Sequence, residues 1–339
     1  MGKVRELTRK LRRGGKRQTE REKVEERREE VLANGRKFKY PLQYAKSTLV
    51  IITTVIIVVA MGLFAGLSWF SLYKLQTEND IMYRLTGILP VPVAKIDGRG
   101  VRFSDYLLIY RSTITPVEQQ GQMGGTVGDL EAMRSHYKRA ALTEAENYAY
   151  AMGLAGEMGL SVSEEEIDAA VTEQRKVGGV ERSMEAFTKI LADNFGLNMT
   201  EYRRMVYLNL VKQKVAREMD TRADEIAARV EASLAEGKKL AEIAGELGDE
   251  VMYEETGGLV DKMNVDGGRA LKAMSQEVGQ VSERMFASSG EGYYFVETLE
   301  KGEKGVSYAS ILVPLTVFEE KVAILRGEGK VREYIEIEE

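Results

Sequence analysis

The chain has 339 residues, which is enough for about two domains of ordinary size. It contains no cysteine and a single histidine, His136, which excludes disulfides, thiolate zinc sites, cysteine nucleophiles and any mechanism that needs two imidazoles. The net charge of −5 hides an asymmetry. Residues 1–46 hold 16 basic and 7 acidic side chains and carry +9, whereas the remaining 32 basic and 46 acidic residues carry −14.

The basic segment 1–46 is predicted to be a cytoplasmic tail. Its middle part interleaves acidic and basic residues, as a solvated helix does, and it has few aromatic side chains that could stack on bases. A nucleic-acid arm is therefore the less favoured interpretation. We expect the tail to set the membrane topology and to be attracted to anionic lipid, with no nucleic acid as partner.

The next segment, Ser47–Phe70, has no charged side chain. As a helix it would span roughly 36 Å, enough to cross a hydrocarbon core of about 30 Å with some tilt. A cleavable signal peptide usually has an apolar core of only about 7–15 residues, and a core helix of a soluble domain is a further alternative. We predict a transmembrane helix over residues 47–72 that contacts membrane lipid. Because Lys and Arg stay inside, the N-terminus should be cytoplasmic and the later domains extracytoplasmic, at the plasma or inner membrane.

A juxtamembrane linker is expected over residues 73–92, followed by a mainly helical domain over residues 93–222. The run "PVPVAKIDGRGVRFSDY" predicts a short β-hairpin, with Ser104 as the cap of the following helix. The Gly-rich run "GQMGGTVGD" then predicts a loop.

The stretch Leu130–Met219 is predicted to be helical. Ser163 is followed three residues later by Glu166, which is the pattern of a capping box. Thr200 is expected to open another helix, and apolar residues recur along it at helical spacing. Each helix has one apolar face, so the helices must pack on one another.

Residues 223–313 predict a small α+β unit. Two Ala-rich helices are joined at Gly237, and alternating runs on either side of Ser288–Gly290 predict two strands. Residues 314–339 predict a closing helix and strand. The strand Val331–Ile337 is expected to pair with Val93–Ile96, because neither run has another obvious partner. The fold class is therefore α+β.

The sequence carries no motif that specifies a chemical reaction. It contains no P-loop, no GxGxxG, no HExxH and no GxSxG, and it predicts no cofactor and no metal site. The acidic run Glu164–Glu166 is interpreted as a solvated helix start and His136 as a residue on a helix surface.

The order of these parts resembles the SurA and PrsA type of extracytoplasmic chaperone. "VAKIDGRGVRFSDY" is similar to the family's opening strand pair, and "SVSEEEIDAAV" is similar to its "V-S-x-E-E-V-D" helix start. "FTKILADNFGLNMTEYRRMVYLNLVKQKV" is similar to a third signature of the family. The resemblance covers residues 93–219, and it implies binding of unfolded or nascent exported polypeptides.

Residues 223–313 resemble a parvulin, the prolyl-isomerase module that such chaperones often carry. "EVGQVSERMFASSGEGYYFVETLEK" is similar to the family's closing strands, and Gly257-Gly258-Leu259 falls at its Gly-Gly-Asp-Leu-Gly. The family's opening strand is missing before Ala223, but "SYASILV" at 307–313 is similar to it. This order suggests a permuted module, in which the same sheet position is filled from the other end of the chain.

The expected active-site residues of a parvulin are replaced. Its two histidines correspond to Tyr294 and Ser310, and Asp249 lies near the position of its central acid. Arg269 falls about where an aromatic residue of the proline pocket is expected. The remaining apolar positions, which we expect to contact clients, are Leu271, Met274 and Phe286. The resemblance therefore implies a weak or inactive isomerase.

Three functions follow from these observations. The favoured one is a membrane-anchored chaperone or foldase for exported chains, in which adaptable apolar side chains such as methionine contact many partners. The alternatives are an active prolyl isomerase and a non-catalytic scaffold or adaptor of an envelope complex.

Overall fold

The structure, a computed structural model, describes residues 20–35, 41–122, 129–177, 180–261, 264, 266–287, 290–303 and 305–337. Most of the Gly-rich run, residues 1–19 and 36–40 of the basic tail, and Ser288–Ser289 lie outside these residues. The chain divides into two units, Met1–Phe70 and Ser71–Glu339, and each is described by itself.

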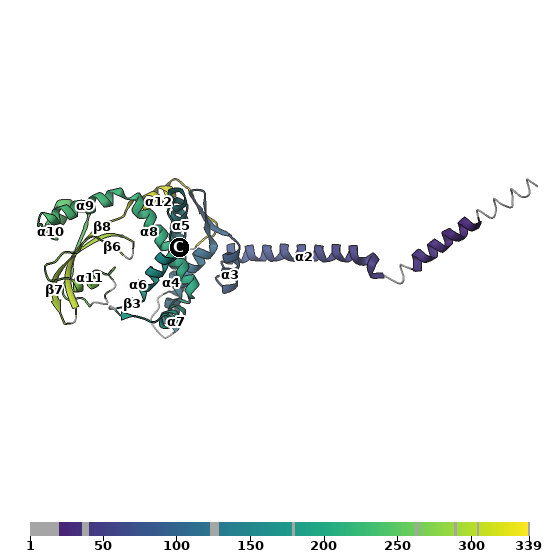
Figure 1. Cartoon of the computed structure of the whole chain (residues 1–339), viewed down its shortest axis with the longest axis horizontal. Helices are drawn as coiled ribbons and strands as arrows, with labels where there is room; N and C mark the ends of the chain where they lie inside the picture. Colours follow the sequence, from purple (N-terminus) through teal and green to yellow (C-terminus); the bar gives the residue numbers. More distant parts are fainter. Residues whose placement is uncertain are drawn as a thin grey trace, which may run out of the picture. The chain divides into compact units, whose positions relative to one another are not determined.

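The first unit contains a helix over residues 20–35 and most of helix α2, Pro41–Tyr73 (Figure 1). The part Leu49–Tyr73 has a mean hydropathy of 2.7, and none of its most apolar window is buried. Among the described residues it is the one helix that could cross a membrane by length and composition. Its exposed apolar surface argues against a core helix of a soluble domain.

The second unit begins with the last residues of α2 and contains a helical part and a sheet part. We call residues 71–220 and 317–337 the helical unit and residues 221–316 the sheet module. The helices of the helical unit are α3 (Asp80–Ile88), α4 (Phe103–Gln122), α5 (Leu130–Met158), α6 (Glu164–Arg175), α7 (Met184–Phe195), α8 (Met199–Met219) and α12 (Val317–Gly327). Its strands are β1 (Pro92–Ile96), β2 (Arg99–Arg102), β3 (Lys176–Val177), β4 (Val180–Glu181) and β9 (Val331–Glu333).

The two ends of the helical unit meet in a three-stranded antiparallel sheet of order β2-β1-β9. Ala94 pairs with Glu333 and Ile96 pairs with Val331, which confirms the predicted pairing of the C-terminal strand with the hairpin. The regular strand is shorter than expected and ends at Glu333. Ile335, beyond the strand, is nevertheless buried.

The main core of the helical unit joins segments that are far apart in sequence. Leu72 at the end of α2 packs in the same cluster as Tyr106 of α4 and Leu142 of α5. Helix α12 and the C-terminal segment also contribute buried side chains, namely Phe318, Val322, Leu325, Ile335 and Ile337. The C-terminal residues therefore complete a core that begins more than 200 residues earlier.

The helix boundaries follow local capping signals. The capping box of Ser163 and Glu166 is present at the start of α6, as predicted. A second capping box, Asn198 with Glu201, starts α8 at Met199, one residue before the expected start. Helix α4 begins at Phe103, so Ser104 lies inside its first turn and the expectation that it caps this helix is wrong.

Residues 73–92, expected to be a linker, include helix α3. Tyr73 donates its hydroxyl to the carbonyl of Pro92 at 2.6 Å, and its ring meets the Phe103 ring edge-to-face. Met82 and Tyr83 of α3 pack against the main core. This segment is therefore tied to the helical unit along its length.

The sheet module consists of a four-stranded antiparallel sheet with helices on both faces (Figure 1). Its elements are α9 (Thr221–Ala235), α10 (Leu240–Leu247), η1 (Gly248–Glu250), β5 (Met252–Glu255), α11 (Arg269–Ser275), β6 (Met285–Phe286), β7 (Gly292–Gly302) and β8 (Gly305–Pro314). The strand order is β5-β8-β7-β6. Helices α9 and α10 cover the face that carries Tyr293 and Phe295, and α11 covers the face that carries Tyr294 and Val296.

Asp220 joins the two ends of the sheet module to the helical unit. Its side chain, in a residue only 2% exposed, accepts a hydrogen bond from the backbone N–H of Ala223 at 2.9 Å. Its other oxygen accepts from the N–H groups of Thr316 at 2.7 Å and Val317 at 3.2 Å. One carboxylate thus caps the helix that enters the module and the helix that leaves it.

Candidate functional site

Tyr294 and Ser310, the positions of the two expected histidines, lie on adjacent strands of the sheet module. Tyr294 is on β7 and pairs with Leu312, and Ser310 is on β8 and pairs with Val296. Both residues contact Arg269 of α11. The guanidinium carbon lies 4.6 Å from the centre of the Tyr294 ring, and Nη1 lies 3.2 Å from Ser310 Oγ. The structure therefore brings the two positions together around an arginine.

Arg269 has two further polar partners. Its Nη1 lies 2.7 Å from Glu254 Oε2 on β5, a residue that pairs with Ser310 across the sheet. Its Nε donates to the backbone carbonyl of Asp266 at 2.8 Å. The side chain of Arg269 is 15% exposed. We call Arg269 and these partners the Arg269 cluster. Its guanidinium is committed to charged, polar and aromatic neighbours.

Asp266 is the acid at the buried side of the Arg269 cluster. Its Oδ2 accepts hydrogen bonds from the hydroxyl of Tyr308 at 2.7 Å and from the N–H of Ala270 at 3.1 Å. Burial, and then this bond to a carboxylate, raise the pKa of Tyr308. Asp249, the acid expected from the sequence, lies in η1 and is exposed.

The hydroxyl of Tyr294 is also engaged. It donates to Glu291 Oε1 at 2.5 Å, and burial followed by this hydrogen bond raises its pKa above the ordinary value. The phenol is therefore protonated at neutral pH. The guanidinium of Arg269 lies beside the Tyr294 ring. Catalysis of X-Pro rotation would need an apolar slot for the proline ring at this place, so the cluster does not suit that reaction.

The three residues expected to contact clients do not form one patch. Leu271 and Met274 lie on α11, where Leu271 is exposed and Met274 packs against the cluster on that face. Phe286 lies on β6 and packs on the opposite face of the sheet. Its ring is 4.7 Å from the guanidinium carbon of Arg217 on α8. Phe286 thus contributes to the contact between the sheet module and the helical unit.

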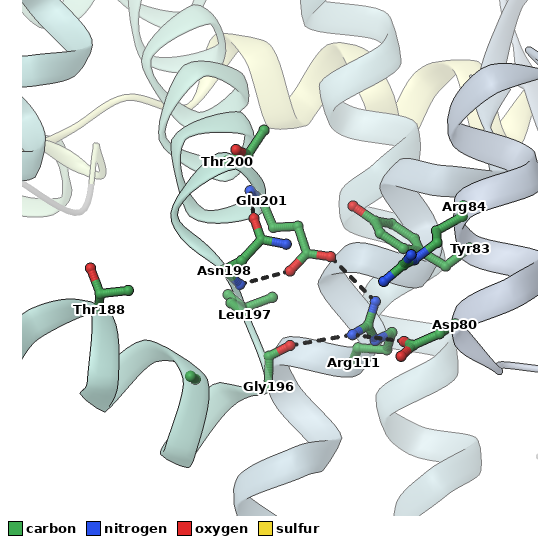
Figure 2. Close-up of a pocket in the computed structure, with 11 residues that line it drawn as sticks. Asp80, Tyr83, Arg84, Arg111, Thr188, Gly196, Leu197, Asn198, Thr200 and Glu201 are labelled. Atoms are coloured by element: carbon green, nitrogen blue, oxygen red, sulfur yellow. Dashed lines mark hydrogen bonds and ion pairs between the residues drawn. The ribbon is translucent and has the colours of Figure 1, made fainter.

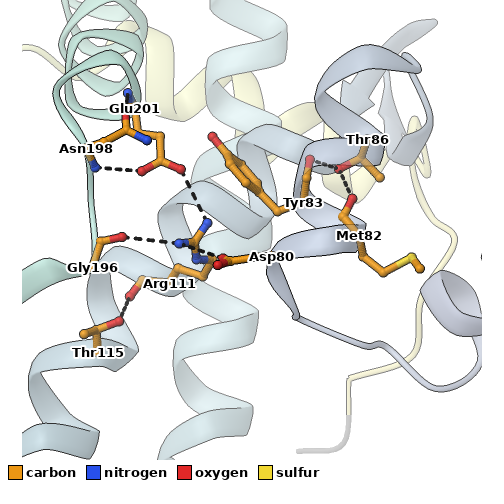
Figure 3. A network of polar contacts seen from close by, with 9 residues as sticks. All are labelled: Asp80, Met82, Tyr83, Thr86, Arg111, Thr115, Gly196, Asn198 and Glu201. Atoms are coloured by element: carbon orange, nitrogen blue, oxygen red, sulfur yellow. Dashed lines mark hydrogen bonds and ion pairs between the residues drawn. The ribbon is translucent and has the colours of Figure 1, made fainter. Parts of the chain in front are cut away.

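A polar pocket of about 580 Å³ lies in the helical unit between α3, α4, α7 and α8 (Figure 2). Arg111 is at its centre. Its guanidinium lies 3.2 Å from Asp80 and 3.5 Å from Glu201, and it donates to the carbonyl of Gly196 at 3.3 Å (Figure 3). It also lies over the ring of Tyr83, 4.8 Å from the ring centre.

The contacts of Arg111 in this pocket connect neighbouring helices. Burial, and then the charge of Glu201, raise the pKa of Tyr83 to about 12, so its hydroxyl stays protonated. Arg111 pairs with two carboxylates and donates to one carbonyl, whereas its buried Nη1 has no hydrogen-bond partner among the described residues. The network holds α3 to α4 and to the start of α8.

A second hollow, of about 420 Å³, lies between α5, α6 and α8. We call it the α5–α8 groove. Its apolar lining comes from Tyr148, Ala170, Tyr202, Met205, Val206 and Leu210. Its polar lining comes from Glu173, Gln174, Asn209 and Gln213, three of which carry amides. Gln213 Nε2 donates to Asn209 Oδ1 at 3.0 Å. Apolar walls with a few amides suit an extended polypeptide, because the remaining amide donors and acceptors can bond to a backbone of any sequence.

The sheet module borders one end of the α5–α8 groove. A Cβ added at Gly290, in the loop before β7, would lie 2.7 Å from Cγ of Gln213. Gly290 also has a φ of +82°, which favours glycine. A glycine at this position therefore allows the loop to approach α8 closely.

The comparison with protein families identifies the helical part. The model of the SurA-like N-terminal domain matches residues 42–216. The chain therefore belongs to the family of proteins with a SurA-like N-terminal domain, and the matched range includes the apolar helix and the α5–α8 groove. This membership confirms the resemblance to SurA-type chaperones and supports a chaperone-type function. No curated protein and no solved structure matches the chain.

Sequence reasoning missed Glu254, Asp266 and the α5–α8 groove. The position of Asp266 four residues before Ala270 is a usable local signal, because acidic side chains favour helix starts. Glu254 had no such signal, since only the strand register places it opposite Ser310.

Proposed function

We propose that the protein is a membrane-anchored extracytoplasmic chaperone that holds unfolded exported polypeptides in the α5–α8 groove. The groove is the observation that carries the proposal. It lies on the SurA-like domain and combines two tyrosines, a methionine and aliphatic side chains with backbone-binding amides. Methionine adapts its shape to many partners, as a chaperone for diverse clients requires.

The anchor in this proposal is the span Leu49–Tyr73. Its 25 residues exceed the length of a typical signal-peptide core, and the basic tail before it favours retention on the cytoplasmic side. The folded unit would then lie outside the cytoplasm, where exported chains emerge unfolded.

The sheet module is proposed to be a degenerate, permuted parvulin-like domain without isomerase activity. In support of the permutation, the run 307–313 lies in β8, an inner strand between β5 and β7. In support of inactivity, Arg269 lies between Tyr294 and Ser310. We therefore expect the module to border the client groove without accelerating X-Pro rotation.

The test is suppression of aggregation by the full chain in lipid nanodiscs, with a denatured model protein as client. The wild type should suppress aggregation at near-stoichiometric ratio. Met205→Glu places a charge in the groove and should weaken suppression several-fold. Met184→Glu is the matched control, because Met184 is exposed at the start of α7 and does not line the groove.

A photo-crosslinking residue at Gln174, on the exposed rim, gives a second measurement that does not disturb packing. Client should crosslink at position 174 and not at position 184. Absence of suppression and of crosslinking would overturn the chaperone proposal in favour of a scaffold. A prolyl-peptide isomerisation rate raised by the wild type and abolished in Tyr294→Ala would instead make the sheet module an enzyme.

A further inference from the structure

Helix α3 presents an apolar face that the described residues do not cover. Its inner face is packed, since Thr86 is fully buried and Met82 and Tyr83 contact the main core. Its outer face carries Ile81, which is 68% exposed, and Ile88, which is 82% exposed. Residues seven positions apart lie on the same side of a helix, so these two side chains form one stripe.

The stripe continues at both ends of the helix. Leu75 in the segment before α3 and Leu89 directly after it are also exposed. The other large apolar side chains exposed in the described part of this unit occur singly, such as Val180 and Ile324, or as pairs on α7 and β5. A run of four exposed aliphatic residues within fifteen positions is therefore a distinct feature of the segment around α3.

Positive charge accompanies this apolar face. Arg84 of α3, which also lines the edge of the polar pocket, and Lys74 in the segment before it are both exposed. The acids of the same segment have cationic partners, because Asp80 lies 3.2 Å from Arg111 and Glu78 lies 2.7 Å from Lys138. The aliphatic stems of Lys and Arg can lie on apolar surface while their charged ends reach phosphate groups.

The segment before α3 is short and fixed. Asp80 follows Tyr73 by seven residues, so the connection spans at most about 25 Å. Thr77 N–H donates to the carbonyl of Ser71 at 3.0 Å, and the hydroxyls of these two residues are bonded at 2.9 Å. Helix α3 is thus tethered close to the C-terminal end of the apolar span.

We propose that α3 lies in the membrane interface, with Ile81 and Ile88 in the boundary between acyl chains and headgroups and Arg84 near lipid phosphates. This second membrane contact would restrict the orientation of the folded unit on the bilayer. The inference rests on the proposed anchor. Amphipathic helices bind interfaces in this way through buried apolar area and attraction to anionic lipid.

The experiment uses the full chain in vesicles of phosphatidylcholine and phosphatidylglycerol. Because the chain contains no cysteine, single cysteines can carry a polarity-sensitive dye without other changes. The test position is Ile88→Cys, and the matched control is Ile324→Cys on α12, which is 52% exposed. A third variant, Ile57→Cys in α2, reports on the anchor.

Lipids with a quencher near the headgroup should quench the dye at position 88 at least threefold more than at position 324, with a blue-shifted emission. Equal quenching at 88 and 324, with the dye at 57 quenched by a second lipid whose quencher lies deep in the acyl chain, would overturn the interfacial helix and leave the anchor intact. Loss of quenching at 57 as well would mean that the anchor itself fails. A blue shift at 88 without lipid quenching would indicate a protein contact and also overturn the proposal.

Discussion

The helical unit and the sheet module complete their cores by different paths of the chain. The sheet module is formed by one continuous segment, with separate apolar clusters on the two faces of its sheet. The helical unit instead needs residues from both sides of that segment, because α12 and the C-terminal residues pack with α4, α5 and α8. The sheet module is therefore inserted into the helical unit. The stability of the helical unit depends on residues that follow the module in the chain.

Removal of the Phe318 side chain should have the largest effect among the tests of how the two parts complete their cores. Phe318 of α12 is 2% exposed and its ring lies 5.8 Å from that of Tyr150 on α5. Phe318→Ala should destabilise the helical unit by about 3–5 kcal/mol, because it removes a buried aromatic ring and leaves a cavity. Hydrogen exchange should show faster opening of α5 and α8 and little change in β7 and β8.

Ile324→Ala on the same helix is the control for Phe318→Ala. Ile324 is more than half exposed, so this change should cost less than about 1 kcal/mol. Equal acceleration of exchange in the two parts would show that they unfold together and that the insertion has no stability of its own.

The pairing of the two chain ends could be predicted from the sequence, because the β-rich runs at 93–96 and 331–337 had no other strand as partner. The capping box at Ser163 is also a purely local signal. The start of α4 was misplaced, because Phe103 already adopts helical backbone before the better capping residue Ser104.

The Arg269 cluster could be predicted only in part. The resemblance indicated Tyr294, Ser310 and Arg269, but not that one guanidinium contacts both other side chains. Glu254 and Asp266 come from other elements, and their placement depends on strand register and on the turn before α11. Contacts between residues that are far apart in the chain produce no periodic pattern in the sequence, so they could not be predicted from it. The same holds for the α5–α8 groove, which three helices form together.

The second prediction addresses the junction between the two parts. Asp220→Ala removes the acceptor for three backbone N–H groups, on Ala223, Thr316 and Val317. Because the site is buried, we expect a loss of about 3–4 kcal/mol. Urea unfolding followed by dyes on single cysteines in each part should then show two transitions that lie further apart than in the wild type.

Asp224→Ala is the control for Asp220→Ala. Asp224 lies on α9, the helix that Asp220 caps. It is half exposed and pairs with Arg284 at 3.0 Å, so its loss should cost at most about 1 kcal/mol. If Asp220→Ala were as mild as Asp224→Ala, the carboxylate would not be the element that joins the parts.

The smallest expected effect concerns Glu146, an acid in the core that the returning C-terminal helix completes. Glu146 of α5 is fully buried and forms an ion pair with Arg326 of α12. Burial outweighs the attraction of Arg326 and raises the pKa of Glu146 to about 7. The folded state therefore binds a proton more tightly than the unfolded state, in which the pKa is near 4.5. The stabilising effect of that proton is present below about pH 4.5 and is lost as the pH rises to about 7.

Glu146→Gln keeps the shape of the side chain and removes this titration. Relative to the variant, the wild type should lose on the order of 2–3 kcal/mol of unfolding free energy between pH 4.5 and pH 8. The measurement is urea unfolding of both proteins at several pH values, with a reporter on the helical unit. Only the difference between the two curves is used, because titrating groups that do not interact with Glu146 contribute equally to both. A wild type that gains stability over the variant as the pH rises would show that Arg326 outweighs burial. In that case the ion pair between Glu146 and Arg326 would stabilise the contact between α5 and α12. If burial dominates, as we expect, apolar packing stabilises this contact instead.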